Sequence, residues 1–179
     1  MTRWLPIAML AALIVIFIVQ LANEKAPHEL NENTGAMVGK TVPATSLPIL
    51  KGDIETFDAA MASERPVILN FFASWCTPCL AEHAQLLALK EAGFTVYGIA
   101  WRDSAKNIQG WLDEHGNPYD AVWLDESGNS AIPFGLRGVP ETYVVQNGAI
   151  LFHQAGVVTD AIRQQQLLPY LEVHDEASE

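Results

Sequence analysis

The chain has 179 residues, of which 50% are hydrophobic, and its 21 acidic residues against 10 Lys and Arg give a net charge of −11. This length suits one domain of modest size together with an anchor segment. The excess of negative charge excludes nucleic acid as a partner, because binding to phosphates requires clustered Lys and Arg.

A segment without charged residues, 4–22, lies close to the N-terminus. At 1.5 Å per residue it reaches roughly 30 Å, the thickness of the hydrocarbon core of a bilayer. A cleaved signal peptide is the alternative, but the apolar run is long for one and Gln20-Leu21-Ala22 is a poor cleavage site. We therefore expect an uncleaved transmembrane signal-anchor over 4–22. Arg3 before it and Glu24 after it indicate a cytoplasmic N-terminus at 1–3.

Residues 23–39 are polar and contain Pro27 and Gly35, so we expect a linker that leads into a folded domain over 40–172. The acidic residues 173–179 are expected to form a tail. The chain would be a single-pass protein of the inner (cytoplasmic) membrane, with its soluble domain in the periplasm.

The first expected elements of the domain are two strands, 45–50 and 53–57, joined by a hairpin turn at Lys51-Gly52. The nearly continuous apolar run 66–72 predicts a strand that is buried on both faces. A helix is expected over 76–92.

A second buried strand is expected over 95–101 and a helix over 104–115, with Ser104 as its N-cap. A short strand at 121–124 follows. Further along the chain, Asn147-Gly148 is a strong hairpin signal between two short strands.

An amphipathic helix over 160–171 closes the domain. Strands that alternate with helices and then end in a hairpin and a helix predict the α/β class, with a mixed central sheet flanked by helices.

The only two cysteines stand in Cys76-Thr77-Pro78-Cys79. A disulfide between them closes only a small loop, and the stabilisation by a cross-link shrinks with loop length, so a structural role is disfavoured. A zinc site would need a second pair or nearby histidines, and attachment of c-type haem would need a histidine where Leu80 stands. The pattern indicates a redox-active disulfide, with no metal and no other cofactor.

The strand 66–72 runs into Cys76, which is therefore expected at the N-terminus of the next helix. Unpaired backbone N–H groups and the helix dipole favour a thiolate there. Cys79 lies one turn further on, shielded, and should keep a higher pKa. We therefore expect Cys76 to be the exposed attacking thiol and Cys79 to resolve the mixed disulfide.

Residues 69–79 resemble the active-site strand and turn of the thioredoxin superfamily. Three further segments resemble motifs of the CcmG/DsbE family, namely Cys79-Leu80-Ala81-Glu82-His83, Gly116-Asn117-Pro118-Tyr119 and residues 135–143 (Gly-Leu-Arg-Gly-Val-Pro-Glu-Thr-Tyr). These are membrane-anchored thiol:disulfide interchange proteins of cytochrome c biogenesis. The resemblance covers nearly the whole chain and implies a thioredoxin-like fold.

The resemblance also implies roles for residues near the cysteines. Pro140 corresponds to the cis-proline that faces the disulfide, although X–Pro bonds are usually trans. It leaves the backbone of Val139 free to pair with an incoming chain. Trp75 would form a lid and contact surface, whereas Trp101, Trp111 and Trp123 are expected in the core.

Two acids are expected to accept the proton that Cys79 must lose. Glu82 lies three residues beyond Cys79 on the same helical face, and Glu141 follows the cis-proline. Asn70 supports this interpretation, because thioredoxins carry a buried aspartate at the corresponding position. The alternative for Glu82 is a solvated helix residue, and for His83 a histidine on the helix surface is expected.

The sequence therefore predicts a thiol:disulfide oxidoreductase that acts as a reductase in cytochrome c maturation. Its partner would be apocytochrome c or a maturation thiol protein, and a membrane electron-donor thiol reductase would return it to the dithiol form. The alternatives are a tethered thioredoxin-like reductase with another substrate, a general oxidant, and a non-catalytic module that binds apocytochrome.

Overall fold

The computed structural model describes residue 35 and residues 37–54 and 56–172. The expected anchor 4–22 and the expected tail 173–179 both lie outside the described residues. Among the residues that are described, no helix is both long enough and apolar enough to cross a bilayer.

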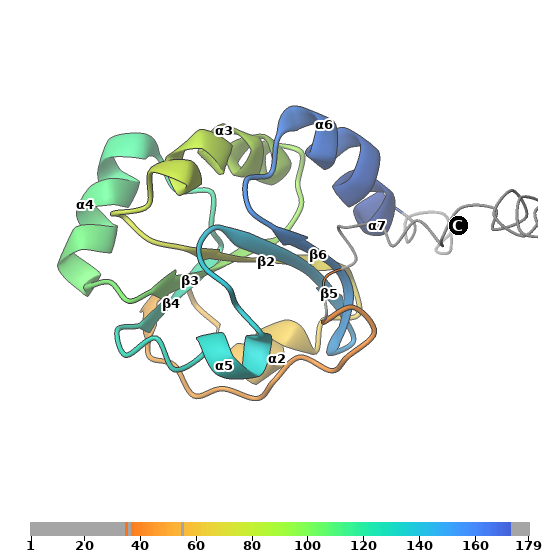
Figure 1. The fold of residues 1–179 in the computed structure, drawn as a ribbon, viewed down its shortest axis with the longest axis horizontal. Coiled ribbons are helices and arrows are strands. Elements are labelled where there is room, and N and C mark those ends of the chain that lie inside the picture. Colours follow the sequence, from red (N-terminus) through yellow and green to blue (C-terminus); the bar gives the residue numbers. More distant parts are fainter. Residues whose placement is uncertain (1–34, 36, 55, 173–179) are drawn as a thin grey trace, which may run out of the picture. The chain divides into compact units, whose positions relative to one another are not determined.

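Six strands form one mixed sheet in the order β1-β4-β3-β2-β5-β6 (Figure 1). The strands β2, β3 and β4 run parallel to one another, whereas β1, β5 and β6 join by antiparallel pairing. Their bounds are β1 Ile49–Lys51, β2 Val67–Phe72, β3 Val96–Trp101, β4 Ala121–Asp125, β5 Glu141–Gln146 and β6 Ala149–Ala155. The predicted α/β class with a mixed central sheet is confirmed.

Helices cover both faces of this sheet. Figure 1 shows α3, α4 and α6 over one face and α2 and α5 over the other. The helices are α2 Phe57–Met61, α3 Thr77–Glu91, α4 Ala105–His115, α5 Ala131–Phe134, α6 Asp160–Ile162 and α7 Leu168–Glu172, with a π-helical turn Arg163–Leu167 between the last two.

The central strand β2 is buried along its whole length because both of its faces are covered. Ile68 and Phe72 belong to the core beneath α3 and α4. Leu69 and Phe71 point the other way, into the core beneath α2 and α5. Alternation along the strand thus gives the sheet two separate cores.

Two of the expected local signals are found in the structure. The Ser104 Oγ accepts a hydrogen bond from the Asn107 N–H at 3.3 Å, which caps α4. Asn147 and Gly148 both have positive φ, at 49° and 73°, as the tight turn between β5 and β6 requires.

The predicted hairpin at Lys51-Gly52 is wrong. The strand β1 pairs with β4 across the sheet edge, and the chain after Gly52 enters α2 instead of a second strand. The Oγ1 atom of Thr56 accepts a hydrogen bond from the Ala59 N–H at 3.1 Å, and Asp58 lies in the first turn. A capped helix start therefore prevails over the local strand pattern.

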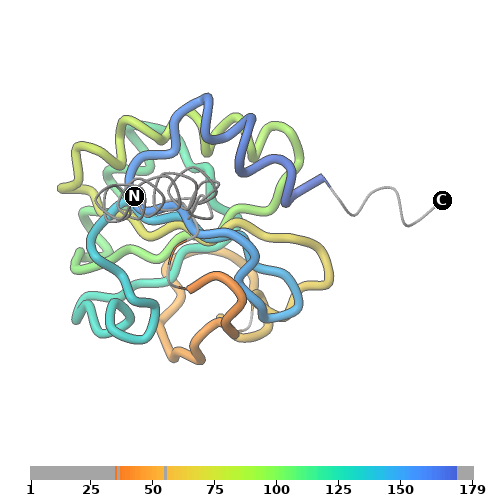
Figure 2. Tube along the Cα trace, turned by 45° about the vertical axis from the view of Figure 1, so that its right-hand side comes forward, coloured from red at the N-terminus to blue at the C-terminus, as the bar shows by residue number. Residues whose placement is uncertain are grey.

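The segment that leads into the domain lies along β6 (Figure 2). The Gly39 N–H donates to the Ile150 carbonyl at 2.8 Å, and the Ile150 N–H donates to the Lys40 carbonyl at 2.9 Å. Met37 is buried in the core beneath α2 and α5. The packed part of the chain therefore includes residues that were expected in the linker 23–39.

The expected C-terminal helix is present but has an irregular centre. Thr159 caps its start, and a π-helical turn precedes α7. Pro169 lies in the first turn of α7, and a proline has no N–H to donate to the preceding turn. The wider turn is consistent with this missing hydrogen bond.

Candidate active site

The two cysteines form a disulfide at the start of α3. The S–S distance is 2.14 Å and the two Cα atoms are 5.3 Å apart. Cys76 is the N-cap of the helix, and its Sγ accepts a hydrogen bond from the Cys79 N–H at 3.1 Å. A sulfur in this place faces the positive end of the helix dipole, so the structure favours a thiolate there after reduction.

The expected exposure of Cys76 is not found, because only 4% of the residue is accessible, against 2% for Cys79. The loop before β5 covers it. The Val139–Pro140 peptide bond is cis, and the Val139 carbonyl oxygen lies 3.5 Å from the Cys76 Sγ. The expected cis bond before Pro140 is therefore present, and the Val139 carbonyl faces the disulfide.

Glu82 is completely buried on the same face of α3 as Cys79. Its Oε1 accepts a hydrogen bond from Nδ2 of Asn70 at 2.8 Å, and its Oε2 accepts one from the Val158 N–H at 2.8 Å. Burial raises the pKa of Glu82 to about 7, and the two hydrogen bonds oppose this shift only in part. A carboxyl group with this pKa can both take up and release a proton near neutral pH.

Asn70 connects Glu82 to two neighbouring hydroxyl groups. Its Nδ2 also donates to the Thr142 Oγ1 at 3.0 Å, and its Oδ1 accepts from the Tyr119 hydroxyl at 2.9 Å. Burial, followed by the charge of Glu82, raises the pKa of Tyr119 well above its usual value, so the phenol stays protonated and donates. The structure thus shows how Asn70 acts: its neutral amide holds the carboxyl group of Glu82 in place.

Glu141 lies on the opposite face of the sheet from Glu82. Asn70 is paired with Thr142, and Phe71 is paired with Glu141. Because side chains alternate along a strand, Thr142 points toward α3 whereas Glu141 points toward α5. The structure therefore does not bring the two expected proton acceptors together.

Trp75 lies beside the disulfide and is 55% exposed. Its indole N–H donates to the Arg102 carbonyl at 3.1 Å, and its ring lies 6.2 Å from that of Trp101. The Oδ2 of Asp103 accepts a hydrogen bond from the Ser74 N–H at 2.7 Å. The loop after β3 therefore fixes the turn that carries Trp75, a contribution that sequence reasoning missed.

The other aromatic residues follow the expectations in part. Trp111 and Trp123 are buried, whereas Trp101 is half-buried. The expected surface position of His83 is wrong, since only 3% of the residue is exposed. Its Nε2 lies 3.1 Å from the Gly116 carbonyl oxygen, and burial lowers the pKa of the ring, so His83 is neutral and donates there.

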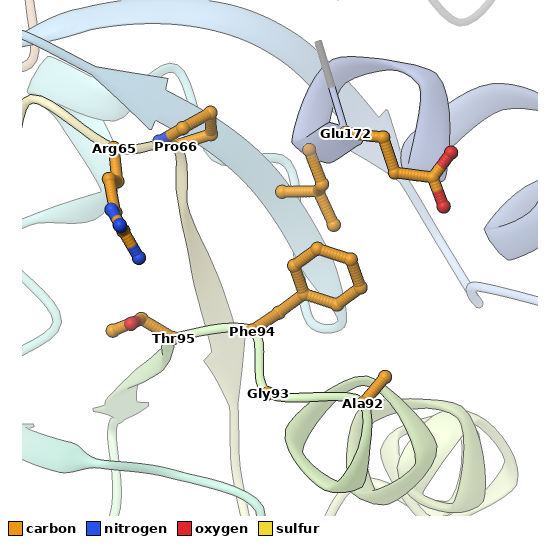
Figure 3. A pocket seen from close by; sticks show the side chains of 8 residues that line it. Arg65, Pro66, Ala92, Gly93, Phe94, Thr95 and Glu172 are labelled. Atoms are coloured by element: carbon orange, nitrogen blue, oxygen red, sulfur yellow. The ribbon is translucent and has the colours of Figure 1, made fainter. Parts of the chain in front are cut away.

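A cavity of about 310 Å³ lies at the far end of β2 from the cysteines (Figure 3). Its lining includes Arg65, Phe94 and Glu172. Because β2 separates it from Cys76, it is not part of the disulfide site. In the described part of the chain, no three His, Cys, Asp or Glu side chains are grouped to hold a metal ion.

Residues 37–169 match the Redoxin family. The chain is 33% identical over 168 residues to the thiol:disulfide interchange protein DsbE of Yersinia pestis, covering 93% of this chain and 89% of that protein. It is 36% identical over 145 residues to the thiol:disulfide interchange protein HelX of Rhodobacter capsulatus, covering 80% and 82%.

A solved structure shows the same fold. The crystal structure of a putative thiol:disulfide interchange protein DsbE from Chlorobium tepidum matches with a TM-score of 0.60 at 24% identity, covering 75% of this chain and 97% of that one. The thioredoxin-like arrangement of sheet and helices predicted from the sequence is confirmed.

Proposed function

Because the chain belongs to the DsbE family of thiol:disulfide interchange proteins within the wider Redoxin family, we propose that this oxidoreductase acts as a reductase in cytochrome c maturation. The observation that carries the chemistry is the Cys76–Cys79 disulfide at the start of α3, beside a buried acid. Free thiols are required for haem attachment, and an oxidising compartment removes them, so a dedicated reductant is needed there.

The proposed reaction begins with the dithiol form. The Cys76 thiolate attacks one sulfur of a partner's disulfide, which forms a mixed disulfide and releases the other partner sulfur as a thiolate. Cys79 then loses its proton and attacks the Cys76 Sγ. The second partner sulfur leaves as a thiolate, so two electrons reach the partner while Cys76 and Cys79 become oxidised.

We assign the proton of Cys79 to Glu82. Glu82 lies one turn along α3 from Cys79, on the same buried face, and the pKa of its carboxyl group is raised to about 7. In the ionised state it can accept the thiol proton, and it can return that proton when a donor reduces the disulfide again.

We also propose the location given by the sequence. The uncharged segment 4–22 would anchor the chain in the inner membrane, with residues 1–3 in the cytoplasm and the domain in the periplasm. The direct partners would be an apocytochrome c segment or a maturation thiol protein, and a membrane thiol reductase would supply the electrons.

The test is covalent trapping in cells whose own family member has been deleted. Cys79→Ala should leave the partner bound to Cys76 through a mixed disulfide, because nothing can resolve it. We expect a protein that carries a Cys-x-x-Cys-His segment, or a thiol protein that handles one. Cys76→Ala is the matched control and should trap no such partner. Trapped proteins unrelated to cytochromes would instead favour a reductase with another substrate.

A further inference from the structure

A second buried polar cluster lies on the sheet face that carries no cysteine. It consists of Glu141 and Tyr143 on β5 and His153 on β6, and each of the three side chains is almost completely buried. Tyr143 is paired with His153 across the two strands, and their rings stack at 4.2 Å with an angle of 7° between the planes.

The carboxylate of Glu141 is surrounded by donors. Oε1 accepts a hydrogen bond from the Arg137 N–H at 2.7 Å. Oε2 lies 2.7 Å from Nε2 of His153 and accepts from the Tyr143 hydroxyl at 3.0 Å. Burial alone would raise the pKa of Glu141, but the hydrogen bonds outweigh it and the pKa lies below its usual value. Glu141 is therefore a fixed negative charge and a poor proton acceptor at neutral pH.

This carboxylate closes the loop that faces the disulfide. Arg137 and Glu141 are the two ends of a five-residue turn, and the Val139–Pro140 bond lies between them. The Gly156 N–H holds the Pro140 carbonyl at 2.9 Å. At the tip of the same turn, the Val139 carbonyl lies against the Cys76 Sγ. The position of Val139 therefore depends on the hydrogen bonds that the Glu141 carboxylate makes.

His153 is bound on one side only. Its Nδ1 is buried and has no hydrogen-bond partner in the described part of the chain. Gly35 packs against this atom so closely that a Cβ there would lie 1.7 Å from it. The ring is therefore oriented by its Nε2 contact with Glu141, and an unsatisfied polar atom is tolerated to keep that contact.

We propose that Glu141 and His153 form a positioning pair, which holds the cis-proline turn so that the Val139 backbone can receive a partner chain next to Cys76. This inference rests on the proposed reductase function, because it concerns how a peptide substrate docks. It assigns Glu141 no part in proton transfer.

The test separates docking from chemistry with two substrates and the full-length chain. One is an oxidised Cys-x-x-Cys-His peptide, which has a backbone to dock. The other is hydroxyethyl disulfide, which has none. His153→Phe keeps the ring stack on Tyr143 but removes the donor to Glu141. We expect KM for the peptide to rise about fivefold or more while kcat changes less than about twofold, because binding and not bond cleavage is affected. Exchange with hydroxyethyl disulfide should be unchanged.

Three further variants make the test decisive. His153→Gln retains an N–H donor toward Glu141 and should keep a nearly wild-type KM, whereas Glu141→Gln should raise it. His115→Phe, a histidine substitution in α4 away from the turn, should leave both substrates unaffected. If His153→Phe does not fold, the contrast between His153→Gln and Glu141→Gln is sufficient.

A wild-type KM in both His153→Phe and Glu141→Gln, or an equal slowing with both substrates, would overturn the positioning pair. Failure of the wild-type protein to reduce the peptide, with hydroxyethyl disulfide still turned over, would instead overturn the proposed substrate.

Discussion

The side-chain amide of Asn70 donates a hydrogen bond of 2.8 Å to the buried carboxyl group of Glu82. One residue lies on the central strand and the other on α3, so the contact joins the sheet to the helix that starts at Cys76. The amide cannot titrate, and it orients the carboxyl group toward the interior. Glu82 is therefore the single titratable group of this contact. Its protonation state controls the proposed transfer of the proton from Cys79.

Glu82→Gln should slow the resolution of the mixed disulfide by Cys79. The pKa of Glu82 is raised to about 7 by burial, so the wild-type rate should increase with pH through about 7 as the carboxylate forms. In the variant this inflection should disappear, and the rate at pH 8 should fall on the order of 10- to 100-fold, at or below the lower end of what a general base contributes. Single-turnover kinetics from pH 5 to 9 measure both effects.

The matched control is Glu91→Gln, an exposed glutamate at the end of the same helix. It should reproduce the wild-type profile. An unchanged profile in Glu82→Gln would remove the acid from the mechanism.

Glu82 should also make the folded domain less stable as pH rises. Its pKa is raised from 4.5 to about 7 on folding, so the folded state binds the proton more tightly than the unfolded chain does. The stabilisation is complete below pH 4.5 and is lost as pH rises through 7, which amounts to about 2–3 kcal/mol between pH 5 and 8. Urea unfolding of wild type and Glu82→Gln at both pH values isolates this effect. An equal pH dependence in the two proteins would contradict it.

The reduced protein should contain two unequal thiols. Cys76 caps α3 and accepts the Cys79 N–H, whereas Cys79 lies inside the helix. We expect the helix N-terminus to lower the pKa of the Cys76 thiol, so that it lies below the pKa of Cys79. Alkylation rates of the Cys76→Ala and Cys79→Ala variants as a function of pH give the two values. Equal midpoints near 8.5 would refute the assignment of the nucleophile.

Glu82 and Glu141 should act independently. They lie on opposite faces of the sheet and have no hydrogen-bond partner in common. The double substitution by glutamine should therefore change the free energy of unfolding by the sum of the single changes, within about 0.5 kcal/mol. A double-mutant cycle measures the difference. A coupling above about 1 kcal/mol would contradict the independence of the two acids.

Asp103→Ala should loosen the turn before Cys76. It leaves the N–H groups of Ser74 and Ser104 without their acceptor, and Asp103 is only 7% exposed. We expect a loss of about 1–3 kcal/mol in the free energy of unfolding. The emission of Trp75 should also change, because its ring is attached to the same loop. Asp113→Ala on the exposed face of α4 is the control and should alter neither property.

Much of this architecture could be predicted from the chain. Apolar runs identified the buried strands, and Asn147-Gly148 identified the hairpin. The turn signal at Lys51-Gly52 predicts a strand over 53–57, but Thr56 caps a helix whose apolar side packs under β4. That packing involves residues far apart in the sequence, so no local pattern reports it.

The site was predictable along α3 and less so across the sheet. The buried residues of α3 repeat at helical spacing, and they are Cys79, Glu82, His83, Leu86 and Leu89. This periodicity could have shown that Glu82 and His83 face inward. The alternation along β5 could likewise have separated Glu141 from Thr142. The contacts made by Val158, Tyr119 and Asp103 depend on loops that meet only in the folded chain.

The neutrality of Asn70 limits how many protons the site can store. Formation of the disulfide from two thiols releases two protons, yet only one titratable carboxyl group lies in this network. An aspartate in place of Asn70 would put two carboxyl groups within hydrogen-bond distance, and they would share a proton and titrate as a pair. Because Asn70 carries an amide, the network can hold only one of the two protons. The second proton must already have left Cys76 before the disulfide forms. Only the proton of Cys79 then passes to Glu82, because Cys76 is the cysteine that is already a thiolate in the reduced protein.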